Sequence, residues 1–215
     1  MCRFVCVICG IFILRRHYAS LCKKVNKIIT VLTIFAANIV NRGDFVKIIL
    51  NAGHTKSGAG SGAVGYINES AETRKVVSLI KYYLDGKGHD VIIANVDKAE
   101  SQSAYLYGVT KQANKHTDAD LFVSVHFNAG GGQGCECYTW KGKKTAQAVG
   151  VCDELSKYGF VNRGVKDGSN LYVISKTTMP ALLVEVCFVD SMGDCSRYKR
   201  LGNRVAQAIT RGILK

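Results

Sequence analysis

The stretch that decides the fold is residues 46–69, VKIILNAGHTKSGAGSGAVGYINE, which joins a predicted strand to a predicted helix. The apolar run at 46–50 is typical of a strand covered on both faces of a parallel sheet. His54 follows the end of this strand, Asn68 is a predicted N-cap, and Glu69 falls in the first turn of the next helix. A crossover helix starts at the edge where its strand ended, so His54 and Glu69 should share one edge of the sheet. Since a helix N-terminus favours an ionised carboxylate, the stretch predicts a metal-binding loop.

The rest of the chain alternates predicted strands with predicted helices. Further helices are expected at about 69–86, 103–116, 143–158 and 194–214, and further strands at 89–96, 120–129, 135–140, 171–174 and 181–189. This alternation is typical of an α/β fold. We therefore expect a three-layer sandwich in which helices flank a mainly parallel, twisted central sheet of about six strands.

Two further residues join the predicted metal-binding loop. His126 repeats the position of His54 at the C-terminal end of a buried strand, the edge where open α/β sheets place ligands. Glu185 interrupts the apolar strand at 181–189, where an unpaired carboxylate would be costly to bury. A salt bridge to Arg163 is the structural alternative for Glu185. A His, His, Glu set leaves zinc an open position for water, and a nearby free carboxylate can take that water's proton.

The remaining histidines and the cysteines have structural interpretations. His17, His89 and His116 are not placed at the predicted ligand edge. The nine cysteines lack the spacing of a disulfide framework and point to synthesis in a reducing compartment. We interpret Cys152, Cys187 and Cys195 as reduced packing residues, and Cys135 and Cys137 as neighbours on one face of a strand, for which a metal role is the weaker interpretation.

The charge of the chain is concentrated at its start. Residues 1–43 hold seven of the 29 Lys and Arg residues and no acidic residue, which leaves 22 basic against 16 acidic residues in the remainder. This mild excess favours weak attraction to polyanions without choosing among nucleic acid, anionic lipid and acidic wall polymers. No basic recognition helix or run of aromatic residues for base stacking supports nucleic acid.

Residues 1–45 differ in composition from the rest. Their two apolar runs, 4–14 and 28–40, are short for a bilayer span, and a signal peptide would be poorly formed. We predict that residues 1–45 are not part of the domain, either because the translation start is misassigned or because they form a poor signal or anchor. We expect cytoplasmic synthesis without a functional signal peptide, and no stable membrane insertion of residues 46–215.

Residues 46–215 resemble a known family, the zinc N-acetylmuramoyl-L-alanine amidases of the Amidase_3 type, especially the catalytic domains of clostridial phage endolysins. The resemblance rests on segments 51–54, 68–69, 124–129, 163–166 and 180–188, in this order and spacing. It implies one Zn²⁺ per chain held by His54, Glu69 and His126, with Glu185 as the catalytic glutamate.

The same resemblance implies the reaction and the partner. It implies hydrolysis of the amide between N-acetylmuramic acid and L-alanine in peptidoglycan, with action at the bacterial cell wall, and weaker substrate contacts from Asn128, Glu136 and Arg163. The segment 189–194 departs from the pattern of many members, which concerns a local turn rather than the chemistry. A zinc exopeptidase and a catalytically silent wall-binding protein stay open as alternatives, and the sequence sets no oligomeric state.

Overall fold

The computed structural model describes residues 45–215, so the prediction for residues 1–45 lies outside the described residues except for Phe45. Twelve elements follow in the order β1 (Lys47–Ala52), α2 (Glu69–Asp85), β2 (Asp90–Ile93), α3 (Gln102–Ala113), β3 (Leu121–Asn128), β4 (Cys135–Thr139), the 3₁₀ turn η1 (Trp140–Gly142), α4 (Ala146–Ser156), β5 (Asn162–Asp167), α5 (Tyr172–Ser175), β6 (Ala181–Phe188) and α6 (Met192–Ile213).

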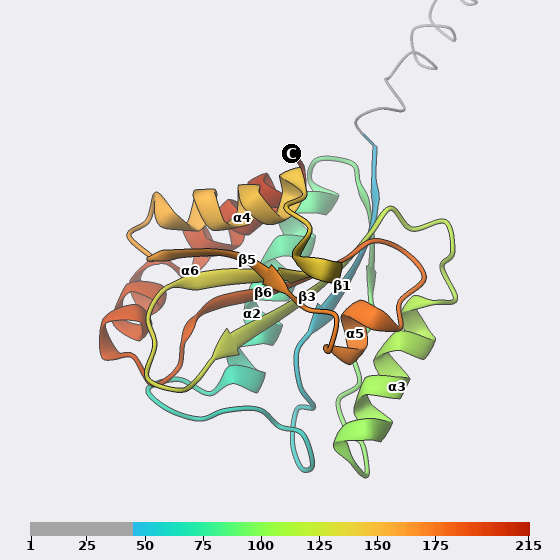
Figure 1. The fold of residues 1–215 in the computed structure, drawn as a ribbon, viewed down its shortest axis with the longest axis horizontal. Helices are drawn as coiled ribbons and strands as arrows, with labels where there is room; N and C mark the ends of the chain where they lie inside the picture. Colours follow the sequence, from blue (N-terminus) through green and yellow to red (C-terminus); the bar gives the residue numbers. More distant parts are fainter. Residues whose placement is uncertain (1–44) are drawn as a thin grey trace, which may run out of the picture. The chain divides into compact units, whose positions relative to one another are not determined.

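The six strands form one sheet in the order β2-β1-β3-β6-β4-β5 (Figure 1). Strands β2, β1, β3 and β6 are parallel, while β4 pairs antiparallel with β6 and parallel with β5. The C-terminal ends of β1, β3 and β6 therefore share an edge with the N-terminal ends of β4 and β5. The predicted α/β sandwich with a mainly parallel sheet is confirmed.

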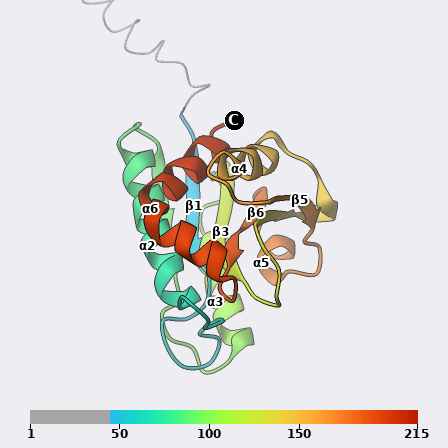
Figure 2. The same ribbon diagram turned by 90° about the vertical axis from the view of Figure 1, so that its left-hand side faces the viewer.

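Helices cover both faces of the sheet (Figures 1 and 2). On one face α2, α4 and α6 enclose the larger core, which includes Ile48, Leu50, Val125 and Val184, all fully buried. On the other face α3 and α5 cover a smaller core around Phe122. Alternate strand residues point to opposite faces, so His126 and Glu185 lie on the face of Phe122 and Leu183.

Two sequence-based assignments near the sheet edge were wrong. Residues 171–174, predicted as a strand, lie mostly in the short helix α5, and the sixth strand is β5 at Asn162–Asp167. Val173 and Ile174 are adjacent in sequence and both buried, which one helical turn allows but a strand with one covered face does not. β5 was missed because it is an edge strand with a single large apolar residue, Val165.

The caps of the long helices agree with the sequence. Asn68 accepts a hydrogen bond from the amide of Ala71 and starts α2, and Gly86 ends this helix as predicted. Ser191 caps α6 by accepting from the amide of Asp194, and the helix begins at Met192, two residues before the predicted start at 194. None of the helices in the described part of the chain is long and apolar enough to cross a membrane.

Candidate metal centre

His54 lies in the tight turn that follows β1. Its φ of 68° is in the left-handed region, which a non-glycine residue adopts only when its surroundings hold it there. The first turns of α2 hold this backbone: the Thr73 hydroxyl donates to the carbonyl of Gly53 at 3.2 Å, and the Arg74 guanidinium donates to the carbonyl of His54 at 3.1 Å. The helix that carries Glu69 therefore also fixes the position of His54.

Glu69 is the first residue of α2 and is almost completely buried. One carboxylate oxygen accepts from the backbone amide of Phe127 at 3.0 Å and the other from the amide of Ala63 at 2.9 Å. Burial opposes ionisation of Glu69, but hydrogen bonds from His126 and His54 outweigh it and lower the pKa of this carboxyl. Glu69 is thus an ionised group in a fixed orientation.

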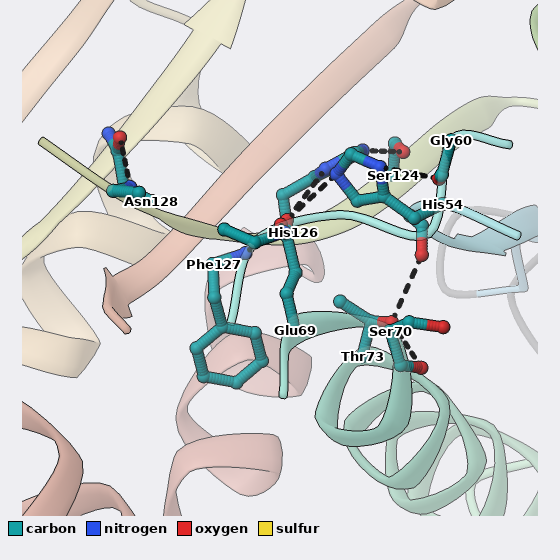
Figure 3. A network of polar contacts seen from close by, with 12 residues as sticks. His54, Gly60, Glu69, Ser70, Thr73, Ser124, His126, Phe127 and Asn128 are labelled. Carbon is teal, nitrogen blue, oxygen red and sulfur yellow. Dashed lines mark hydrogen bonds and ion pairs between the residues drawn. The ribbon is translucent and has the colours of Figure 1, made fainter. Parts of the chain in front are cut away.

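Two imidazoles and this carboxylate converge on one point (Figure 3). The Oε1 atom of Glu69 lies 3.0 Å from Nε2 of His54 and 3.2 Å from Nδ1 of His126. The three donor atoms lie within 4.8 Å of one another, so one metal ion can be held between them. The structure therefore brings together the three residues that the sequence predicted as ligands.

The outer nitrogen of each imidazole has a hydrogen-bond partner that sets its tautomer. Nδ1 of His54 lies 3.0 Å from the carbonyl of Gly60, and a proton shared with that carbonyl leaves Nε2 free to bind a metal. Nε2 of His126 lies 3.1 Å from the hydroxyl of Ser124, which itself donates to Oδ1 of Asn51 at 2.7 Å. The amide of Asn51 donates to the carbonyl of Ala94, so a buried chain of hydrogen bonds orients His126.

Glu185 lies beside His126 on the neighbouring strand. The two residues are paired in register between β3 and β6. Its Oε2 atom is the one buried side-chain oxygen or nitrogen without a hydrogen-bond partner in residues 45–215. Burial, with the negative charges of Glu69 and Glu136, raises the pKa of Glu185 to about 8. A carboxyl with a buried, unpartnered oxygen next to the candidate metal ligands is suited to proton transfer.

The predicted substrate contacts form a separate network on the next strands. Glu136 pairs in register with Glu185, is 1% exposed, and accepts hydrogen bonds from Asn128, Tyr138, Arg163 and Lys166. Although burial alone would raise the pKa of Glu136, these donors lower it. The salt bridge between Arg163 and Glu185, the alternative considered from the sequence, does not form, because Arg163 pairs with Glu136 at 2.6 Å. Figure 3 shows Asn128 apart from the two histidines.

The cysteines agree with their structural interpretation. Cys135, Cys137, Cys152, Cys187 and Cys195 are all buried free thiols, and no disulfide occurs within the part of the chain that the structure describes. Cys135 and Cys137 lie in the larger core, on the face of the sheet opposite Glu185. They do not belong to the metal-binding group formed by the described residues.

An α/β sandwich with two histidines and a glutamate converging at the C-terminal edge of its parallel strands can hold a metal ion at the edge where such sheets bind ligands. The family model for N-acetylmuramoyl-L-alanine amidase of the Amidase_3 type matches residues 48–215. The chain therefore belongs to the N-acetylmuramoyl-L-alanine amidase family.

Individual relatives agree with this assignment. An uncharacterized protein of Clostridium perfringens is 36% identical over 76% of this chain and 51% of its own length. The N-acetylmuramoyl-L-alanine amidase CwlM of Bacillus licheniformis is 33% identical over 78% of this chain and 65% of its own length. An endolysin of Bacillus phage SPP1 is 32% identical over 76% of this chain and 63% of its own length. The chain thus spans between half and two-thirds of the length of these curated relatives.

A solved structure has the same architecture. The catalytic domain of the CD27L endolysin, which targets Clostridia difficile, superimposes with a TM-score of 0.73 at 28% identity, over 79% of this chain and 97% of that one.

Three residues of the site and its surroundings were not singled out from the sequence: Ser124, Asn51 and Lys166. Ser124 and Asn51 are polar residues within buried strands, a signal comparable to that of Glu185, and each lies two or three residues from a predicted ligand.

Proposed function

We propose that the protein is a zinc-dependent N-acetylmuramoyl-L-alanine amidase that hydrolyses the amide between N-acetylmuramic acid and L-alanine in bacterial peptidoglycan. The observation that carries this proposal is the arrangement of His54, Glu69 and His126 around one point, with the unpartnered oxygen of Glu185 on the adjacent strand. Membership of the amidase family and the names of the relatives support it. The protein then acts at the bacterial cell wall.

The donor set fits zinc. Two imidazole nitrogens and one carboxylate oxygen are the ligands of catalytic zinc sites that keep a position open for water or substrate. The Gly60 carbonyl and the Ser124 hydroxyl complete the shell that orients both imidazoles. When bound, zinc lowers the pKa of a water molecule and polarises the carbonyl of the scissile amide.

The side chains of this protein supply the proton transfers. Glu185 takes a proton from the attacking water on its Oε2 atom and passes it to the nitrogen of the leaving L-alanine. Burial raises the pKa of Glu185 to about 8 in the metal-free site, and bound zinc would lower it from there toward the working pH, where a carboxyl can both accept and release a proton. The burial of Glu69 and its contacts with both imidazoles keep the ligand geometry fixed during this transfer.

Analysis of the products tests the proposal. Purified cell wall incubated with the protein should release stem peptides that begin with L-alanine and leave glycan chains intact, as measured by mass spectrometry.

Metal analysis should find one zinc per chain, and a chelator should abolish the release of stem peptides. Shortened stem peptides would instead indicate an exopeptidase, and wall binding without any release would indicate a silent binding protein. His54→Ala, which removes one ligand, is expected to lose both zinc and activity.

A further inference from the structure

The side chains of Arg163 and Lys166 carry more positive charge than their buried partner can neutralise. Both donate to the same oxygen of Glu136, Arg163 at 2.6 Å and Lys166 in closer contact. Glu136 is 1% exposed, whereas the side chains of Arg163 and Lys166 are 35% and 36% exposed. Neither cation pairs with another acidic residue in the described part of the chain. The cluster therefore has one excess positive charge that faces solvent.

A bulge in β5 places both cations on the same carboxylate. Cys135 pairs with Asn162, but Cys137 pairs with Val165, so β5 has one extra residue opposite Glu136. Gly164, in the bulge, has a φ of 76° and no heavy atom where a Cβ would lie. Such bulges aim side chains in directions that a regular strand does not allow. Arg163 is further held by stacking over Phe188, with its guanidinium carbon 5.0 Å from the ring centroid.

The cluster lies in line with the metal-binding group. His126, Glu185 and Glu136 are paired in register on the consecutive strands β3, β6 and β4, so their side chains form a row on one face of the sheet. Strands lie about 4.8 Å apart, which puts Glu136 about 10 Å from His126. An extended peptide advances about 3.4 Å per residue, so two or three residues beyond a scissile amide at the metal would reach the cations.

We propose that Arg163 and Lys166, oriented by Glu136, bind a carboxylate of the stem peptide two or three residues beyond the scissile amide and so select substrates in which this carboxylate is free. This inference rests on the proposed function, because it takes the stem peptide as the substrate. Lys166 contributes the excess charge and is the specificity-determining residue. Glu136 acts through the two cations and has no direct contact with the substrate.

A matched pair of substrates tests this site. Two soluble muramyl tripeptides should differ only at the second residue, which carries either a free carboxylate or its carboxamide. We expect the protein to cleave the carboxylate form with a kcat/KM about two- to fivefold higher at low ionic strength, the range of a solvent-accessible ion pair. The preference should shrink in high salt because the pair is screened. Equal rates for the two substrates would overturn the proposal.

Variants assign the preference to the cluster. Lys166→Met leaves Glu136 paired with Arg163 and should remove the preference, whereas Lys166→Arg should retain it. Lys144→Met, at an exposed lysine before α4, is the matched control and should retain it as well. The ratio of two substrates on one protein is insensitive to partial loss of zinc or of folded protein. A preference that survives in Lys166→Met would contradict the inference.

Binding separates this inference from the amidase activity. The released peptide and its amidated form can be titrated into the full chain by calorimetry, with and without Lys166→Met. Tighter binding of the carboxylate peptide to the unchanged protein only would support the site even if neither tripeptide is cleaved. Equal binding of both peptides would overturn it even if the protein proves to be an amidase.

Discussion

Glu185 is the residue to which we assign proton transfer in the proposed reaction, because its buried Oε2 atom has no hydrogen-bond partner and its strand position pairs with that of His126. Glu185→Gln keeps the size of the side chain and removes its ability to exchange a proton. We expect kcat to fall by about 10² to 10⁴, the usual contribution of a general acid or base. Zinc content should stay at the level of the unchanged protein, as measured by atomic emission. Turnover close to that of the unchanged protein would show that Glu185 is a structural residue.

The same residue should impose a pH dependence on stability. In protein stripped of metal, the pKa of Glu185 is raised to about 8, so the folded state holds a proton that the unfolded state releases near its ordinary pKa of 4.5. The unfolding free energy should therefore decrease as pH rises from about 4.5 to about 8, with a limiting slope of about 1.4 kcal/mol per pH unit for the one proton that the folded state retains. Denaturant titrations across this range measure the decrease.

Glu185→Gln should flatten this profile and make the metal-free protein more stable at pH 8. Bound zinc adds positive charge near Glu185, lowers its pKa, and should move the decrease to lower pH. If the unfolding free energies of the two metal-free proteins change equally with pH, the environment of Glu185 does not raise its pKa. The residue would thus reduce stability in return for reactivity, as functional groups often do.

Ser124 links the ligand His126 to the interior. Its hydroxyl lies between Nε2 of His126 and Oδ1 of Asn51 and is fully buried. Ser124→Ala removes the acceptor for the imidazole proton, so we expect zinc affinity to fall by about 10- to 100-fold, as for other residues that orient metal ligands. Competition with a chromogenic chelator measures this affinity. Thr110→Ala, which removes a buried hydroxyl of α3 away from the ligands, is the matched control and should leave zinc affinity unchanged.

The turn that follows β1, at Gly53 and His54, sets the spacing between the two candidate histidine ligands. A Cβ atom on Gly53 would lie 2.4 to 2.6 Å from the ring of His126, well inside contact distance. Gly53→Ala should therefore displace this imidazole and reduce zinc content while the sheet still forms. Gly202→Ala is the control, because a Cβ there meets open space within α6 and alanine favours a helix by about 1 kcal/mol. Metal analysis and circular dichroism of both variants make the comparison.

The elements also show what a sequence reveals and what it does not. The strands that carry His126 and Glu185, and the strand that ends before His54, were predicted because continuous apolar runs identify buried strands. β5 was not, because an edge strand with one covered apolar residue has no such run, and its bulge interrupts any alternation. Without the strand β5, the sequence also could not exclude a salt bridge between Arg163 and Glu185, the structural alternative considered for Glu185. The antiparallel register of β4 and β6, which places Glu136 opposite Glu185, depends on tertiary contacts that local sequence does not encode.

At the scale of the molecule, the direction of the strands explains why the site is at one edge. β1, β3 and β6 end at this edge and deliver His54, His126 and Glu185, while β4 and β5 begin there and deliver Glu136 and Arg163. A sheet with all six strands parallel would place the last two residues at the opposite edge. The reversal of β4 and β5 therefore extends the site across the sheet from the metal-binding group to the cations.

Described residues in the range 46–215 form both cores on either side of the sheet. Val46 already joins the structure, since its carbonyl accepts a hydrogen bond from the amide of Asp90. A chain shortened to residues 46–215 should fold cooperatively, bind one zinc and release the same products from cell wall as the full chain. Thermal unfolding, metal analysis and mass spectrometry of the released peptides measure these properties side by side. An aggregated or metal-free product from the shortened chain alone would show that residues 1–45 are required for the fold.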